Sequence, residues 1–182
     1  MRKLALALAV LLVPSLLVPA SLARASSATS GASASDFPSS EWRTARITWT
    51  NPAAHTPRIV DLRFAQHRRF DRVVIDVTGK LPGGRTAYRR HFKYDASGEP
   101  VPIRAGLELV LKPAFTIDSD GIDVYDGPRR ARPGFPTLKA VALTGSFEGV
   151  VSFAFGLSPR RAPYRVFVLH QPQRIVVDFK HS

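Results

Sequence analysis

The chain contains no cysteine among its 182 residues. Neither a disulfide nor a lipid-modified N-terminal cysteine is therefore available to it. Exported domains without disulfides depend on a hydrophobic core for their stability, and a chain of this length can form one. The absence of cysteine favours a bacterial-type secreted or cell-envelope protein over a small disulfide-rich extracellular domain.

The sequence also lacks an uninterrupted apolar run long enough to span a membrane. Its one strongly apolar stretch, "LALALAVLLVPSLLVP", follows the basic start "MRK" and contains Pro14 and Pro19. A basic start, a short apolar core and a small-residue exit are the features of a secretory signal peptide. Here the exit is "ASLARA", with Ala23 and Ala25 at the cleavage spacing. We expect residues 1–25 to be removed, leaving no stable membrane span; the alternative is an uncleaved anchor helix.

Acidic residues are scarce, with 14 Asp and Glu against 26 Lys and Arg. A positive excess attracts polyanions. Export makes nucleic acid an unsuitable partner and leaves anionic wall polymers, lipid headgroups and the carboxylates of peptidoglycan. The alternative is that the charge only keeps the protein soluble. We expect a secreted, extracellular protein associated with the cell envelope.

The first part of the segment 26–57 contains few apolar side chains that could be buried. The segment "SSATSGASASDFPSS" is typical of a flexible tether. It leads into a part with a possible short strand at residues 46–50. Trp42 and Trp49 either stack on a ligand or, as we prefer, attach this segment to the core, because each side chain buries a large apolar area.

No stretch after residue 57 shows a long apolar repeat of helical period, and proline recurs too often for many helices. Short alternating or β-branched runs are separated by turn signals such as "TGKLPGG" and "DASGEP". This pattern predicts an all-β fold, an antiparallel β-sandwich of about eight short strands forming one domain over residues 58–182. The expected strands cover residues 58–64, 72–77, 85–94, 107–113, 138–145, 149–157, 164–170 and 174–179.

One strand pattern occurs twice, as "DRVVIDV" at residues 71–77 and "QRIVVDF" at residues 173–179. With a period of two, Arg72, Val74 and Asp76 share one face and the apolar residues between them share the other. We therefore expect the Arg and Asp residues on the outer face, paired across neighbouring strands at about 0.2–1 kcal/mol each. A structural role is preferred to a catalytic one for these acids.

Motifs that would indicate catalysis or metal binding are missing. The histidines show no metal-ligand spacing, and no serine lies in G-x-S-x-G. "DSDGIDVYDG" holds Asp118, Asp120, Asp123 and Asp126, but its Gly and its twelfth residue do not fit the calcium-binding EF-hand pattern. We interpret it as a turn, with calcium binding as the alternative. We expect no enzyme activity, no cofactor and no metal.

Basic residues form four clusters, three of them in expected turns. Arginine forks match the geometry of carboxylates and phosphates. If the clusters meet on one face they form a surface for an anionic polymer, and if they scatter they are solvated charge. His67 either binds a ligand carboxylate or, as we prefer, caps the turn into the next strand. The candidate ligand-binding residues are His67, Arg68, Arg69, Arg89, Arg90, Arg129, Arg130, Arg132, Arg160 and Arg161.

Five segments together resemble the AMIN-like domain of exported actinobacterial proteins: "HRRFDRVVIDVTG", "YDGPRR", "GSFEGVVSFAFGL", "APYRVFVL" and "QPQRIVVDFKH". The family is related to the AMIN domain of cell-wall amidases and secretins. The resemblance covers residues 58 to 181 and implies a β-sandwich of two similar halves. It also implies placement in the envelope by binding peptidoglycan.

The function expected from these observations is non-catalytic binding of peptidoglycan or an anionic glycopolymer of the cell wall. The alternative is a structural or binding module that captures an envelope protein through an exposed strand edge. An enzyme of the cell wall would require a cleft with converging acids or a histidine pair.

Overall fold

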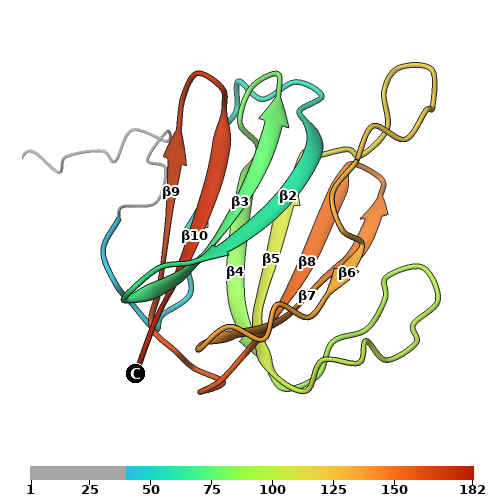
Figure 1. Cartoon of the computed structure of the whole chain (residues 1–182). Coiled ribbons are helices and arrows are strands. Elements are labelled where there is room, and N and C mark those ends of the chain that lie inside the picture. Colours follow the sequence, from blue (N-terminus) through green and yellow to red (C-terminus); the bar gives the residue numbers. More distant parts are fainter. Residues whose placement is uncertain (1–39) are drawn as a thin grey trace, which may run out of the picture. The chain divides into compact units, whose positions relative to one another are not determined.

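The computed structural model describes residues 40–182 (Figure 1). The expected signal peptide at residues 1–25 and the tether up to residue 39 lie outside the described residues. Residues 40–182 contain no helix, and therefore none of the length and apolarity that crossing a bilayer requires.

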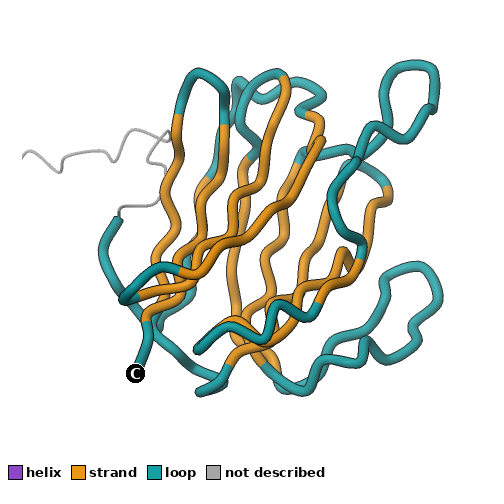
Figure 2. Tube along the Cα trace, viewed as in Figure 1, coloured by secondary structure: helices purple, strands orange, loops and turns teal. Residues whose placement is uncertain are grey.

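The described residues form two antiparallel sheets that face each other (Figures 1 and 2). The six-stranded sheet has the order β1-β4-β5-β8-β7-β6, and the four-stranded sheet has the order β2-β3-β10-β9. The strands are β1 (Thr48–Trp49), β2 (Arg58–Gln66), β3 (Phe70–Thr78), β4 (Gly83–Arg89), β5 (Gly106–Lys112), β6 (Arg130–Ala131), β7 (Leu138–Phe147), β8 (Val150–Leu157), β9 (Tyr164–Leu169) and β10 (Arg174–Lys180).

The all-β sandwich expected from the sequence is confirmed. Each of the eight strands expected after residue 57 is present, and the short strand expected near residues 46–50 is β1. Two details differ. The two-residue β6 was not expected, because it has too few residues to show a pattern. The strand expected at 85–94 ends at Arg89, and its last aromatic residues, Phe92 and Tyr94, lie in the following loop.

The core lies between the sheets and is built from every second residue of each strand. In β3 the inner residues Val73, Ile75 and Val77 are at most 4% exposed. The opposite sheet contributes the fully buried Leu109 and Phe153, among others. Alternation with a period of two thus gives each sheet one apolar face, and burial of these two faces drives folding.

The segment before residue 58 is attached to this core, as the sequence predicts. Trp49 is buried, and its indole N–H donates to the carbonyl of Pro82 over 3.0 Å. Trp42 lies 4.5 Å from the guanidinium carbon of Arg165, measured from the ring centroid. The segment preceding the expected start of the sandwich at residue 58 therefore supplies β1 of the six-stranded sheet.

A second, smaller apolar cluster lies on the outer face of the six-stranded sheet. The loop from residue 90 to 105 places Phe92, Val101 and Ile103 against the small side chains of Ala140 and Ala154. Phe92 and Tyr94 keep the even spacing of a strand, but they pack from the loop onto the sheet. This explains why the pattern extended the expected strand too far.

Tyr125 and Tyr164 are buried and Tyr88 is half-buried. Loss of solvent around these three side chains raises the pKa of Tyr88, Tyr125 and Tyr164 above the ordinary value of 10. The folded state therefore favours the neutral phenols. Their contribution to stability is complete below pH 10 and is lost as the pH rises further. We expect the melting temperature to fall as the pH rises above 10, and the absorbance of these three phenolates to appear together with unfolding. Circular dichroism and absorbance at 295 nm would measure both.

The variant Tyr88→Phe serves as the control for this alkaline transition. It keeps the ring next to Tyr164 and loses the hydroxyl that donates to the carbonyl of Ala162. The fall in melting temperature above pH 10 should be smaller in this variant. Gradual ionisation of Tyr88, Tyr125 and Tyr164 near pH 10 in the folded protein would contradict the prediction.

Candidate functional site

One end of the sandwich collects three connections that come from distant parts of the sequence. Gly106 at the start of β5 lies opposite Gly156 near the end of β8. Leu138 at the start of β7 lies opposite Leu157. The β4–β5 loop, the β8–β9 connection and the segment entering β7 are therefore neighbours in space. Each of them carries arginine.

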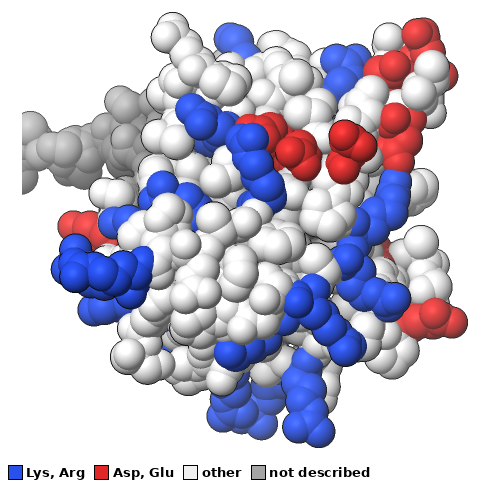
Figure 3. All heavy atoms as spheres, viewed as in Figure 1, with Lys and Arg blue, Asp and Glu red and all other residues white. Residues whose placement is uncertain are grey.

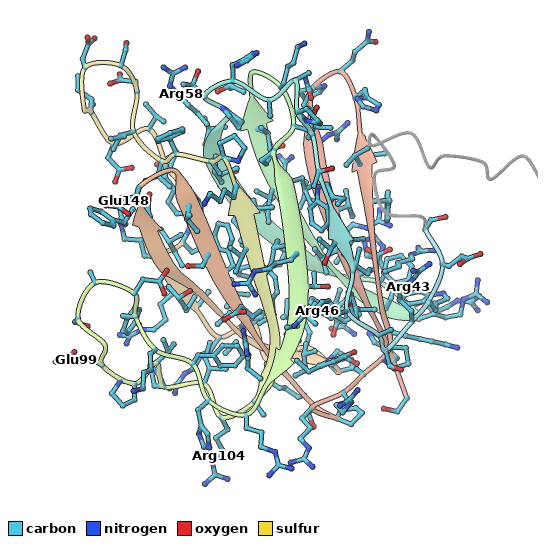
Figure 4. The ribbon with its side chains drawn as sticks, turned by 180° about the vertical axis from the view of Figure 1, so that it is seen from behind. Arg43, Arg46, Arg58, Glu99, Arg104 and Glu148 are labelled. Carbon is cyan, nitrogen blue, oxygen red and sulfur yellow. The ribbon has the colours of Figure 1, made fainter. Side chains whose placement is uncertain are left out.

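These connections enclose a groove, which we call the arginine groove. It has a volume of about 460 Å³. Four cations and a set of apolar residues line it: Pro102, Ile103, Arg104, Ala105, Arg132, Lys139, Ala140, Gly156, Leu157 and Arg160. Figure 4 shows Arg104 pointing away from the sheets at this end.

Two further hollows adjoin the arginine groove and share residues with it. One is lined by Arg90, His91, Arg104, Ala105 and Arg160. The other is lined by Tyr88, Arg89, Arg90, Arg160 and Arg161. Arg160 lines all three, so the hollows form one basic surface that runs across this end of the sandwich.

The arginines of this surface differ in their partners. Arg89 pairs with Glu108, and the guanidinium of Arg161 lies 5.0 Å from the ring centroid of Tyr88. Within residues 40–182, no ion pair joins Arg90, Arg104, Arg132 or Arg160 to a carboxylate. All four are exposed. Converging cations without a carboxylate partner repel each other, and an anion bound between them would relieve that repulsion.

Acidic residues gather at the opposite end of the sandwich. Glu148 lies in the β7–β8 turn, and the Asp-rich loop follows β5 at the same end. In Figure 3 much of the acidic surface lies at the upper right, whereas the lower edge is basic. The basic end would therefore attract an anionic ligand even though acids are present elsewhere.

The floor of the arginine groove is formed by apolar residues. A Cβ at Gly156 would lie 3.0 Å from Ile103 Cγ2 and 3.2 Å from Ala140 Cβ. The absence of a side chain at Gly156 therefore lets Ile103 and Ala140 pack closely over β8. Arginine forks at the rim can bind carboxylate or phosphate oxygens in two-point contacts, while the floor can cover a small apolar group.

The structure brings together part of the set of candidate residues. Arg89, Arg90, Arg132, Arg160 and Arg161 all line the basic surface described above. The other candidates lie elsewhere. Arg129 and Arg130 line a separate hollow with Tyr94, and Arg129 pairs with Asp123. Arg68 and Arg69 lie in the turn between β2 and β3, on the four-stranded sheet.

His67 begins that turn, and its ring stacks on Phe70 with the centroids 4.6 Å apart. Its backbone N–H donates to the carbonyl of Phe70, which closes the turn. The histidine thus has a defined contact within the turn.

Sequence reasoning missed Arg104 and Lys139, as well as the apolar floor. Arg104 stands alone in "PIRAG" and Lys139 lies inside a strand pattern, so neither belongs to a visible cluster. The feature that could have identified these two residues is their position, because both lie within two residues of the start of a strand at this end of the sandwich. Which strand starts meet there depends on the sheet order.

The twin strand motif forms a network on the outer face of the four-stranded sheet. β3 and β10 pair with each other, so that Arg72 lies opposite Asp178 and Asp76 lies opposite Arg174. Arg72 donates to Asp178 through Nε over 2.7 Å, and Arg165 donates through Nε over 2.8 Å. The expected pairing across strands is confirmed at Asp178. Asp76 instead pairs with Arg63.

Burial makes this network more than a surface ion pair. The Asp178 side chain is fully buried, and the two guanidinium groups lie over the rings of Phe70 and Phe167. The hydrogen bond from Arg72 to Asp178 raises the pKa of Arg72. The free energy expected for an exposed cross-strand pair therefore underestimates what Asp178 contributes to stability. Removing one partner of a buried ion pair costs more, because the other charge then stays buried without a partner.

The Asp-rich loop has contacts of its own. Asp118 Oδ1 accepts the backbone N–H groups of Asp120 and Ile122, each over 2.9 Å. Among residues 40–182, no group of three His, Asp or Glu side chains is arranged to hold a metal ion. These contacts are those of a turn stabilised by an aspartate side chain.

Comparison with known proteins gives one match. The model of the AMIN-like domain family matches residues 57–181. No curated protein matches this chain, and no solved structure matches it. The matched residues contain both strands of the twin motif and the whole arginine groove. They also contain three of the four edge strands, β2, β6 and β9, whereas β1 precedes the match.

Proposed function

The chain belongs to the AMIN-like domain family, and from this premise we propose that it is a secreted, non-catalytic protein that binds peptidoglycan or an anionic polymer of the cell wall. Membership of this family indicates a binding module related to the cell wall and a location in the cell envelope. The signal peptide expected at residues 1–25 supports secretion.

The observation that carries the proposal is the arginine groove. Arg90, Arg104 and Arg160 come from two separate loops, converge on one surface and pair with no carboxylate among the described residues. Envelope polymers supply carboxylates or phosphates, the anions that arginine forks match. The function that this geometry supports is binding of a wall anion at this end of the sandwich.

The proposal predicts a loss of wall binding when the groove loses its charge. The triple variant Arg90→Gln, Arg104→Gln, Arg160→Gln should be retained at least tenfold less on isolated cell-wall sacculi, because three charge-assisted contacts are removed from exposed positions. Co-sedimentation of residues 26–182 with sacculi, with and without their anionic polymers and across a salt series, would measure it.

A control variant with the same change of charge separates site binding from general attraction. Lys80, Lys112 and Arg130 are exposed and lie outside the groove. Their replacement by Gln should leave retention within about twofold of the parent, since distant exposed charges are screened. Equal losses in both triple variants would reject the groove as the site. Binding equal to that of an unrelated basic protein would reject the function.

The alternative through an exposed strand edge has less support. β1 and β6, which end the six-stranded sheet, have two residues each. On the four-stranded sheet, Asp126 bonds to Val60 of β2, and Arg43 bonds to Tyr164 of β9. Short or partly occupied edges are poor templates for an added strand, so the groove remains the better candidate.

A further inference from the structure

The arginine groove is charged at its rim and apolar at its floor. Arg104, Arg132 and Arg160 stand beside a surface made by Ile103, Ala140 and Leu157. Small-ligand sites commonly combine an apolar lining with a few polar groups that fix orientation. A ligand that fits this groove therefore carries an anion and a small apolar group close together.

The size of the arginine groove further limits which ligands can fit it. A volume of about 460 Å³ lies within the range of pockets for small molecules, about 300–1,000 Å³. Ile103, Ala140 and Leu157 are at most 9% exposed, so they offer a ligand only small apolar patches between the arginines. The groove thus suits a few ligand residues with short side chains, rather than an extended chain held along its whole length.

The two kinds of wall anion differ in the chemical groups that they would place against an apolar floor. A polyol phosphate has regularly spaced charges, but its carbons carry hydroxyl or ester oxygens. A stem peptide of peptidoglycan that ends in alanine places methyl groups directly beside a carboxylate. Only the second can cover the floor while its carboxylate meets the guanidinium groups.

We propose that the arginine groove recognises the carboxylate end of a short alanine-containing peptide, as in the stem of peptidoglycan, in preference to a polyol phosphate. This inference rests on the proposed function and names the ligand class for the same site. Arg160 is central to it, since it lines the groove and both adjoining hollows. Ala140 and Leu157 would contact the methyl groups.

Calorimetric titration of residues 26–182 with defined probes tests the inference. The probes are a synthetic stem peptide ending in D-Ala-D-Ala, the same peptide ending in Gly-Gly, the same peptide with an amidated C-terminus, and a glycerol phosphate oligomer. Each lost methyl should weaken binding about fourfold, from about 0.8 kcal/mol per buried carbon. Amidation should weaken it at least tenfold, because the charge is lost.

Protein variants locate the effect. Arg160→Gln should weaken binding of the stem peptide at least tenfold, whereas Arg130→Gln, also exposed but in another hollow, should change it less than twofold. Circular dichroism would check that both variants are folded. Exposed arginines without an ion pair can be replaced with little effect on stability.

The outcomes separate this inference from the proposed function. Tighter binding of glycerol phosphate than of the peptide, with a loss in Arg160→Gln, would overturn the preference for peptide and leave wall binding in place. Equal affinity for the Ala and Gly peptides would overturn the role of the floor. Absence of binding to every probe and to sacculi would overturn both.

Discussion

Replacing Asp71 by Ala should lower the free energy of unfolding by about 3–5 kcal/mol. The carboxylate is fully buried. Its Oδ2 accepts the backbone N–H groups of Thr137 and Leu138 over 2.7 and 2.8 Å. Its Oδ1 lies 2.8 Å from His181 Nε2. Removing the acceptor leaves two buried donors without a partner, each at about 1–3 kcal/mol.

The contacts of Asp71 also join the two sheets. The residue belongs to β3, whereas Leu138 begins β7 in the other sheet and Thr137 immediately precedes it. The carboxylate thus acts as a hydrogen-bonded cross-link in a protein that has no disulfide. Its loss should loosen the contact between the sheets at the end that carries the arginine groove.

Thermal and urea unfolding would measure the effect, and Asp76→Ala supplies a control from the same strand. Asp76 pairs with Arg63, whose side chain is 54% exposed, so its loss should cost about 1 kcal/mol or less. For a domain of this size, the Asp71 variant should melt about 10 °C lower. A destabilisation no larger than that of Asp76→Ala would show that Asp71 is not a cross-link.

Replacing Asp178 by Ala should cost about 3 kcal/mol or more, because it leaves two partly buried cations facing each other. Arg72 and Arg165 both donate to this carboxylate. Their side chains are 27% and 23% exposed, so water screens the remaining repulsion only in part. Both guanidinium groups would remain over the rings of Phe70 and Phe167.

A rescue variant distinguishes uncompensated charge from lost packing. Arg72→Met, Arg165→Met and Asp178→Leu together remove every charge of the network and keep its volume roughly constant. Denaturant unfolding should show the triple variant to be more stable than Asp178→Ala by at least 1 kcal/mol, because buried ion networks can be replaced by apolar side chains. A triple variant less stable than the single variant would contradict this explanation.

The strands could be predicted because their pattern is local. A period of two with β-branched residues between Gly- and Pro-rich turns identifies β3, β5 and β10 without knowledge of the fold. The same pattern placed Arg72 and Asp178 on one face. It failed at Phe92 and Tyr94, where even spacing occurs in a loop that packs on a sheet. The alternation of apolar and polar residues indicates which side chains are buried. It does not show whether the backbone is hydrogen-bonded to a neighbouring strand.

The site could be predicted only in part because it depends on the order of strands in the sheet. Arg90 and Arg160 are visible as members of basic pairs, but Arg104 and Arg132 meet them only through the β5–β8–β7 arrangement. The structural role of Asp71 could not be predicted from the sequence for the same reason. The residue precedes the outward-facing Arg72, and its inward position becomes meaningful only when Thr137 and Leu138 lie beside it.

The pairing of β3 with β10 also sets the time at which the domain can fold. Arg72 and Asp178 are 106 residues apart in the sequence, and they lie on the two central strands of the four-stranded sheet. Contacts between such distant residues form slowly and late. That sheet cannot be completed until residues 174–180 are available, so a chain still being synthesised would lack both the finished four-stranded sheet and the apolar face that this sheet covers.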